Sequence, residues 1–229
     1  MSAGLVSIVL PVYNQADHLE TVFNEYLSHM DRLRLPYELL PVINGPRRDR
    51  SLEISREYSA RFPAIRTLCI EAGGWGRAVR HGLANARGDL LCYTNSARTT
   101  AKDLLLIVSY AVAYSGTVIK ANRKIRESWR RRFGSLLYNL ECRSLYDLAC
   151  WDINGTPKVF PRSMTALLNL TRDDDLIDLE FNLVCKREGY PVLEVPILSA
   201  SRSSGKSTTG YRSALGMYLG ALELRKQFR

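Results

Sequence analysis

The stretch Ser7–Asn14, which reads SIVLPVYN, decides the fold class of this 229-residue chain. It overlaps a β-branched and apolar run, Leu5–Pro11, that predicts a buried strand ended by its proline. Apolar residues then recur at helical spacing from Asp17 to Leu33, and Tyr37–Ile43 again has the pattern of a strand. A strand, a helix and a second strand in this order predict parallel pairing through a right-handed crossover.

The same alternation continues through the first half of the chain. It predicts a helix at Ser51–Phe62, a strand at Ile65–Ile70, a helix at Arg77–Ala86 and a strand at Leu90–Thr94. We therefore expect an α/β fold with a Rossmann-like, doubly wound and mostly parallel sheet that is flanked by helices.

The second half has a less regular pattern. Helices are expected at Ala101–Tyr114, with Thr99 or Thr100 as the cap, and at Ser128–Leu148, near Ser163–Leu170, Asp175–Glu188 and Gly210–Lys226. Strands are expected at Val118–Lys120 and Val192–Ile197, and turns over Asp152–Phe160. No linker or repeat interrupts the chain, so residues 1–229 are predicted to form a single domain.

The net charge of +9 indicates an anionic partner or a solvated basic surface. Much of the excess lies in Lys120–Arg132 (KANRKIRESWRRR), and Arg202, Lys206 and Arg212 form a second group. No recognised nucleic-acid module accompanies the charge, which disfavours nucleic acid as the partner. Phosphate-bearing substrates and anionic lipid headgroups remain.

The five cysteines are scattered along the chain without metal-ligand spacing. This pattern predicts reduced thiols in a cytoplasmic protein and gives no reason to expect a catalytic thiol. The first residues show neither a basic leader nor a cleavage site, and no apolar run approaches the roughly eighteen residues of a membrane span. Cytoplasmic localisation is therefore expected.

Ligands of doubly wound sheets bind beyond the carboxyl ends of the strands. In this sequence four segments follow predicted strands and are candidate ligand loops. They are Pro11–Asn14, Asn44–Arg47, Glu71–Gly76 and Asn95–Arg98.

These loops resemble those of the family 2 glycosyltransferases with the GT-A fold, and most of all the dolichol- and polyprenyl-phosphate mannose or glucose synthases. Five motifs carry the resemblance in order along nearly the whole chain. They are SIVLPVYN at Ser7–Asn14, GWGRAVRHGLANARGD at Gly74–Asp89, DINGTPKVFPR at Asp152–Arg162, DLEFNLVCKREGYPVLEVPI at Asp178–Ile197 and RSSGKST at Arg202–Thr208.

The resemblance implies a nucleotide-binding half over residues 1–98 and an acceptor-binding half over residues 99–229. Contacts to a GDP- or UDP-linked hexose are implied for Pro11, Tyr13, Asn14, Asn44, Gly74, Trp75, Gly76, Arg77, Asn95 and Arg98. The glycines of this set would allow the backbone to approach the nucleotide closely. Packing alone is an alternative role for Tyr13.

Contacts to an acceptor phosphate are implied for Arg123, Arg126, Arg202, Ser204 and Lys206, and catalytic roles for Asp152, Arg123 and Arg202. The fork of an arginine meets two phosphate oxygens at once, whereas Lys206 could equally be solvated. Asp152 either orients a substrate or forms an ordinary turn before Asn-Gly. Glu180 is expected near the site and Asp178 in solvent.

The family's metal-binding DxD motif would follow the fourth strand, where this chain has Asn95-Ser96-Ala97. The acidic pair after the second strand is replaced by Ile43-Asn44, and Trp75 stands at a common lysine position. Mg2+ and Mn2+ prefer charged oxygen ligands, so no metal ligand is assigned here. Arg98, just after the slot, could provide the positive charge instead.

Two functions fit this pattern. One is an inverting glycosyltransferase that passes a hexose to a polyprenyl-phosphate-like or small-molecule acceptor without a DxD-bound metal. The other is an inactive relative that binds a nucleotide or regulates a partner enzyme. The basic amphipathic helix at Ser128–Leu148 could rest on a membrane surface, or its apolar face could be ordinary core.

Overall fold

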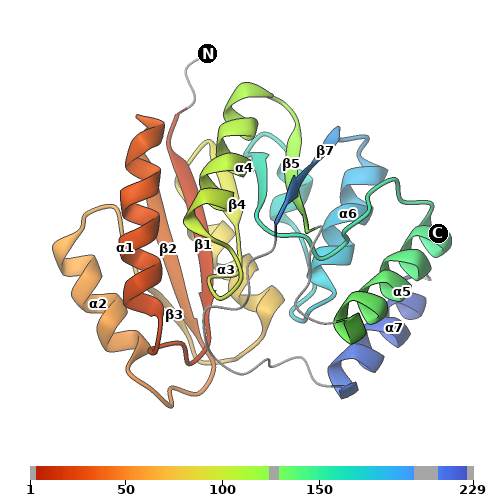
Figure 1. The fold of residues 1–229 in the computed structure, drawn as a ribbon, viewed down its shortest axis with the longest axis horizontal. Helices are drawn as coiled ribbons and strands as arrows, with labels where there is room; N and C mark the ends of the chain where they lie inside the picture. The colour runs from red at the N-terminus through yellow and green to blue at the C-terminus, as the bar shows by residue number, and fades with distance from the viewer. Residues whose placement is uncertain (1–3, 124–128, 199–210, 226–229) are drawn as a thin grey trace.

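The computed structural model describes residues 4–123, 129–198 and 211–225. In these residues one sheet of seven strands has the order β3-β2-β1-β4-β6-β5-β7, and helices cover both of its faces (Figure 1). The strands are β1 (Val6–Val12), β2 (Tyr37–Asn44), β3 (Leu68–Ile70), β4 (Leu90–Tyr93), β5 (Val118–Arg123), β6 (Lys158–Pro161) and β7 (Val192–Ile197). The helices are α1 (Leu19–Met30), α2 (Ser51–Arg61), α3 (Trp75–Asn85), α4 (Ala101–Ala113), α5 (Trp129–Tyr146), α6 (Ile177–Arg187) and α7 (Tyr211–Leu224), with short 3-10 turns at Asp31–Leu33 and Thr165–Leu168.

Strand β1 is an interior strand of the sheet, and it is buried as its sequence predicts. All seven of its residues are buried, and it pairs in parallel with β2 on one side and β4 on the other. Alternate side chains of a strand point to opposite faces. Ile8, Leu10 and Val12 accordingly join the core under α1, α2 and α4, whereas Val9 joins the core under α3 and α6. The α/β, mostly parallel fold is confirmed.

The second half departs from the predicted pattern at β6. Turns were expected over Asp152–Phe160, but Lys158–Pro161 forms a strand that is antiparallel to both β4 and β5. Four residues are too few to show a sequence period, yet Val159 and Phe160 fill the cores on opposite faces of the sheet. Because β6 runs backwards, its first residue lies at the edge where β4 ends.

Other predicted boundaries need smaller corrections. The helix expected near Ser163–Leu170 is only the 3-10 turn, and β5 continues past Lys120 to Arg123. The extra residues of β5 pair with β7 up to Ile197. Of the two candidate caps for α4, Thr100 is the one used, since its hydroxyl accepts the Asp103 amide at 3.1 Å.

Helices α5 and α7 lie side by side at one end of the molecule (Figure 1). Tyr138, Cys142 and Tyr146 of α5 pack with α7 residues in a third apolar cluster. The apolar stripe that the sequence predicts on this helix consists of Trp129, Phe133, Leu136, Leu137 and Leu140, and the last four lie on a different face of α5. These four are between 42% and 59% exposed, so the alternative that the stripe is ordinary core is wrong for them.

No helix in the described residues is both long and apolar enough to cross a bilayer. All five cysteines are free thiols, of which Cys92, Cys142 and Cys185 are buried. Burial raises the pKa of the Cys142 and Cys185 thiols to about 12. Thiols with so high a pKa are weak nucleophiles near neutral pH.

Candidate functional site

The first predicted loops meet at the carboxyl ends of β1 and β2. Pro11 is buried within β1, opposite Val42 of β2. Tyr13 lies against Gly45, because a Cβ atom added there would be 2.9 Å from the tyrosine ring. Asn14 has a left-handed backbone (φ 48°), and its Oδ1 accepts the Arg48 amide at 3.0 Å. Tyr13 thus packs against the loop after β2, and Asn14 holds the same loop through its hydrogen bond.

Asn44 links three segments at this edge. Its Nδ2 donates to the Val12 carbonyl at 2.9 Å, and its Oδ1 accepts the Gly74 amide at 3.3 Å. The side chain is buried, so these hydrogen bonds hold the end of β1 and the glycine loop to the end of β2. The recess between Asn14 and Leu52 has a volume of only about 10 Å³, space for roughly one water. This recess is too small to enclose a nucleoside.

The glycine loop is locked onto the segment before α6. Gly74 has φ 139°, and a Cβ there would be 2.5 Å from the Asp173 carbonyl oxygen. A Cβ on Gly76 would be 2.4 Å from the Arg172 carbonyl oxygen. The Arg77 guanidinium donates to the Asp173 carboxylate at 2.7 Å. The glycines therefore allow a close approach of the loop to the backbone of the segment before α6. The Arg77 guanidinium is bound to the Asp173 carboxylate.

Asp178 is the centre of a buried cluster, and the expectation that it is solvated is wrong. Its carboxylate accepts Tyr93 Oη at 2.9 Å, Trp75 Nε1 at 3.2 Å and Lys158 Nζ. Asp178 is 5% exposed because α6 is buried on every side from Ile177 to Cys185. The cluster fixes the indole of Trp75, the residue at the family's lysine position.

Glu180, the acidic residue expected near the site, accepts hydrogen bonds from backbone amides. Its carboxylate accepts the amides of Thr171 at 2.8 Å and Arg172 at 2.9 Å. It thereby shapes the segment on which the glycine loop rests.

Two buried lysines extend the cluster across the sheet. Tyr93, Lys158 and Lys120 are in register on β4, β6 and β5, and both lysines are fully buried. Burial lowers the pKa of Lys158 to about 8, with Lys120 adding to the effect and Asp178 opposing it. Lys120 Nζ donates to the Asp152 carbonyl at 2.6 Å and to Asn182 Oδ1 at 3.0 Å. A lysine pKa shifted this far is common at functional sites, although structural ion pairs produce it too.

Arg123 and Asp152, both predicted catalytic residues, are brought together. Arg123 donates from Nε at 2.8 Å and from Nη2 at 2.9 Å to the two carboxylate oxygens of Asp152. Burial alone would lower the pKa of Arg123, but the Asp152 charge and hydrogen bonds raise it. Glu194 of β7 accepts the Trp151 and Asp152 amides at 2.7 and 3.0 Å and so supports the pair from behind. Asp152 is therefore more than a turn former.

Four predicted acceptor residues, Arg126, Arg202, Ser204 and Lys206, lie outside the described residues. At the DxD position, Asn95 Oδ1 accepts the Ala97 amide at 3.0 Å and the Ser96 hydroxyl donates to Gln15. Arg98 is half-buried beside them, and its amide donates to the Asn95 carbonyl at 3.1 Å. Nowhere in residues 4–123, 129–198 and 211–225 do three His, Cys, Asp or Glu side chains form a group suited to a metal ion. The donor set at this edge does not fit Mg2+ or Mn2+.

Sequence reasoning missed several residues of the cluster. Tyr93, Lys120, Lys158 and Glu194 were not among the candidates. The two lysines had a usable signal, since each follows or precedes buried apolar residues (Val118-Ile119-Lys120 and Lys158-Val159-Phe160) where a strand pattern would place a core residue. A lysine at such a position is seldom buried without a partner.

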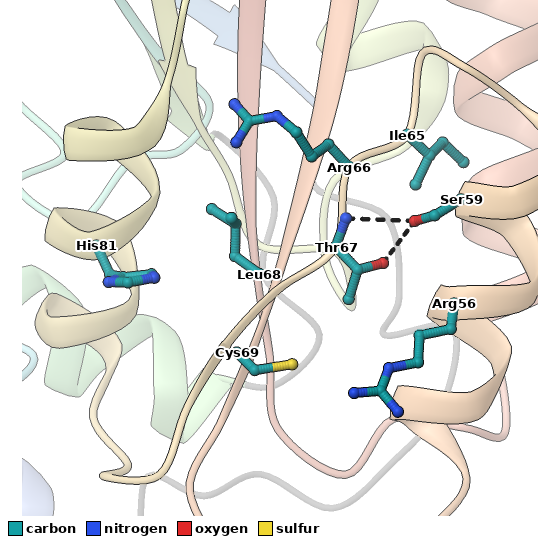
Figure 2. Close-up of a pocket in the computed structure, with 8 residues that line it drawn as sticks. All are labelled: Arg56, Ser59, Ile65, Arg66, Thr67, Leu68, Cys69 and His81. Atoms are coloured by element: carbon teal, nitrogen blue, oxygen red, sulfur yellow. Dashed lines mark hydrogen bonds between the residues drawn. The ribbon is translucent and has the colours of Figure 1, made fainter.

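A separate groove lies away from the strand-end loops. It is an open groove of about 620 Å³ along the free edge of β3, between α2 and α3 (Figure 2). Arg56 and His81 face it from opposite sides, and Ser59 and Thr67 are hydrogen-bonded to each other in its wall (Figure 2). None of the predicted site residues lines it, so the groove is separate from the strand-end site.

The fold and the strand-end site together define the class of protein. The model of the family described as "Glycosyl transferase family 2" matches residues 7–166, which span β1 to the start of the 3-10 turn after β6. The chain therefore belongs to glycosyltransferase family 2, as the motifs predicted.

Individual relatives agree with this assignment. The undecaprenyl-phosphate 4-deoxy-4-formamido-L-arabinose transferase of Edwardsiella ictaluri is 25% identical over 217 residues, which are 93% of this chain and 65% of the relative. The chain thus spans just under two thirds of that relative's length.

Solved structures share the fold. Glucosyl-3-phosphoglycerate synthase from Mycobacterium tuberculosis, in complex with Mn2+, UDP and glucosyl-3-phosphoglycerate, superposes with a TM-score of 0.72 at 15% identity, covering 97% of this chain and 80% of that one. The mannosyltransferase PcManGT of Pyrobaculum calidifontis, in complex with GDP-mannose and Mn2+, gives a TM-score of 0.61 at 16% identity, covering 98% and 63%. At these identities the likeness shows the GT-A fold.

Proposed function

We propose that this protein transfers a sugar from a nucleotide sugar to a phosphate-bearing acceptor of the polyprenyl-phosphate type, with inversion and without a metal in the DxD position. The observation that carries the proposal is the Arg123–Asp152 pair at the carboxyl edge of the sheet. Two nitrogens of Arg123 bind Asp152, and a guanidinium has five N–H groups, so the remaining Nη can donate to a phosphate. Membership of the family and the named lipid-phosphate relative support the choice of acceptor.

The proposed reaction requires alignment of the two substrates and neutralisation of the charge on the leaving diphosphate. A phosphate oxygen of the acceptor attacks the anomeric carbon, the bond from that carbon to the diphosphate oxygen breaks, and the nucleoside diphosphate leaves with the electron pair. The acceptor is already ionised at neutral pH, so no strong general base is needed. Asp152 fixes the direction of the Arg123 fork, and fixed charges of this kind stabilise a transition state at little reorganisation cost.

The donor side is proposed to work without a divalent cation. Asn44 and Asn95 are neutral where the family carries carboxylates, so they do not repel a diphosphate. Arg98, beside Asn95, is the described cation nearest in sequence to the missing motif and would take over part of the metal's electrostatic role. We further propose that the protein acts on the cytoplasmic side, at the membrane surface that holds such an acceptor.

Calorimetric titration with UDP-glucose, GDP-mannose and the free diphosphates, with and without EDTA, tests the proposal. We expect one nucleotide to bind equally well in EDTA, and turnover when a polyprenyl phosphate is added. Binding that requires Mn2+ would overturn the metal-free part, and no turnover on any phosphate acceptor would overturn the reaction.

A second function has its own support. Asp152 neutralises Arg123, and the recess at the nucleoside end is nearly closed, as in a chain that has lost catalysis. In that case the protein would bind a nucleotide or regulate a partner enzyme. Nucleotide binding without turnover, unchanged by Asp152→Asn, would favour this alternative.

A further inference from the structure

Helix α5 carries apolar side chains on two opposite faces. Tyr138 and Cys142 point into the core and are at most 4% exposed. Phe133, Leu136, Leu137 and Leu140 repeat at i, i+3, i+4 and i+7 on the other side and are about half exposed. A soluble helix normally has a polar outer face, and an exposed run of large apolar residues marks a contact surface.

The exposed face continues toward the candidate site. Arg143 follows Leu140 by one turn, and its guanidinium lies 3.7 Å from the ring centroid of Trp151, which is 61% exposed. The Trp151 amide shares the Glu194 carboxylate with the Asp152 amide. A tryptophan and an arginine therefore stand between the apolar stripe and the Arg123–Asp152 pair. We name the residues Phe133, Leu136, Leu137, Leu140, Arg143 and Trp151 the α5 face.

The charge of the chain indicates which partner binds the α5 face. Helix α5 contains four arginines, three of them in its first turn by sequence, and a single acidic residue, Glu141. The whole chain carries a net charge of +9, which repels a second copy and attracts an anionic surface. An apolar helix face in a basic segment of the sequence, with an arginine and a tryptophan at its border, has the features that bind the boundary between lipid headgroups and acyl chains.

We infer that the α5 face docks on an anionic lipid leaflet, with the α5 axis lying in the plane of the membrane. The leucines and Phe133 enter the acyl boundary, Trp151 lies at headgroup level, and the Arg123–Asp152 end of the site faces the lipid phosphates. The inference rests on the proposed function only for the last point, since the docking itself requires no turnover.

Sedimentation with lipid vesicles tests the inference. The whole chain is mixed with vesicles of phosphatidylcholine alone or with added phosphatidylglycerol, at low and high salt. We expect binding to the anionic vesicles that weakens with salt. Leu136→Gln/Leu140→Gln should reduce the partition coefficient at least about tenfold, because each leucine loses apolar area that the bilayer would bury.

Leu106→Gln is the matched control, since Leu106 on α4 is 40% exposed but lies outside the α5 face. It should bind vesicles as the unchanged chain does. Equal binding by the double variant, or no binding of the unchanged chain to anionic vesicles, would overturn the inference. A dimer in light scattering that the double variant dissociates would also overturn it, in favour of a second copy as the occupant.

Nucleotide titration separates this inference from the proposed function. The double variant should bind the nucleotide like the unchanged chain and use a water-soluble short-chain isoprenyl phosphate equally well, while losing turnover on the vesicle-bound acceptor. Vesicle binding without nucleotide binding would contradict the proposed function but support the docking of the α5 face on lipid.

Discussion

The donor and acceptor halves of the sheet edge are held together by different interactions. In the donor half, Asn14 and Asn44 connect the ends of β1 and β2 to neighbouring loops through neutral hydrogen bonds. In the acceptor half, Arg123, Lys158 and Lys120 face Asp152, Asp178 and Glu194 in buried ion pairs. Asn44 stands where the family has a carboxylate, and the charges stand under the part of the site where a phosphate acceptor is proposed to bind.

This difference predicts which substitutions destabilise the protein most. A neutral hydrogen bond contributes only about 1 kcal/mol net, and its loss leaves a modest penalty. A buried ion pair adds little net stability, yet removing one partner costs about 3–5 kcal/mol because a charge is left uncompensated. Substitutions in the acceptor half should therefore have the larger effects, and the donor half should respond little to metal.

The largest effect is expected for Lys158→Met. It leaves the Asp178 carboxylate with only Tyr93 and Trp75 as donors, so the free energy of unfolding should fall by about 3–5 kcal/mol in urea denaturation. The double variant Lys158→Met/Asp178→Asn should recover much of that loss. Lys102→Met, at an exposed lysine of α4, should change stability very little. Equal losses in the single and double variants would show that the pair is not coupled.

The pH dependence of stability gives the next effect. The pKa of Lys158 is about 8 in the folded chain against 10.5 for an unperturbed lysine. Between these values the unfolded chain binds a proton that the folded chain has released, so stability rises with pH there and is flat below pH 8. Relative to Lys158→Met, the unchanged chain should gain at most about 3 kcal/mol across this window. Parallel stability curves for the two proteins would contradict the assignment.

Asp152→Asn should be somewhat milder, because an amide oxygen can still accept one Arg123 hydrogen bond. A loss of about 2–3 kcal/mol is expected, together with a raised KM for the phosphate acceptor as the fork loses its fixed direction. Asp174→Asn supplies the comparison, since Asp174 makes a similar two-oxygen contact with Arg172 at an exposed position. Its loss should stay below about 1 kcal/mol. Comparable losses for both would mean that burial does not set the strength of these pairs.

In the donor half, Asn44→Ala removes the hydrogen bonds to Val12 and Gly74. We expect a loss of about 1–2 kcal/mol and weaker nucleotide binding, because the glycine loop is no longer held to β2. Asn85→Ala, which removes one exposed hydrogen bond at the end of α3, is the control and should affect neither quantity. An unchanged nucleotide affinity in Asn44→Ala would show that the position of the glycine loop does not affect nucleotide binding.

The same contrast explains what the sequence could and could not predict. The parallel strands were predictable because their apolar runs and intervening helical periods are long, as in Leu5–Pro11 and Asp17–Leu33. The pair Arg123–Asp152 was found only as two separate candidates, since 29 residues separate them and their hydrogen bonds depend on β5 and the segment before β6. Motif positions come from the chain order, but side-chain partners come from packing.

Two errors have the same physical origin. Asp178 was expected in solvent because it stands two residues from Glu180 on a predicted helix and so points to a different face. Helix α6, however, lies between the sheet and α5–α7 and has no exposed face there. Strand β6 was missed because four residues after a proline give no period. Both depend on tertiary neighbours that no local pattern contains.

The smallest effect is expected from returning a carboxylate to the DxD position with Asn95→Asp. The aspartate can still accept the Ala97 amide, so the fold should tolerate it. Its charge repels a diphosphate in the donor half, and at a partly exposed position this repulsion is worth about 1 kcal/mol, or roughly fivefold weaker nucleotide binding in EDTA. Adding Mn2+ should recover only part of the loss, because Ala97, at the position of the motif's second carboxylate, is 2% exposed and offers no ligand. Asn169→Asp adds the same charge on an exposed turn far along the chain and should leave the affinity unchanged. If Asn95→Asp bound nucleotide more tightly in Mn2+ than the unchanged chain does, the donor half would still be a metal site lacking one ligand, and the contrast between a neutral donor half and a charged acceptor half would no longer explain its chemistry.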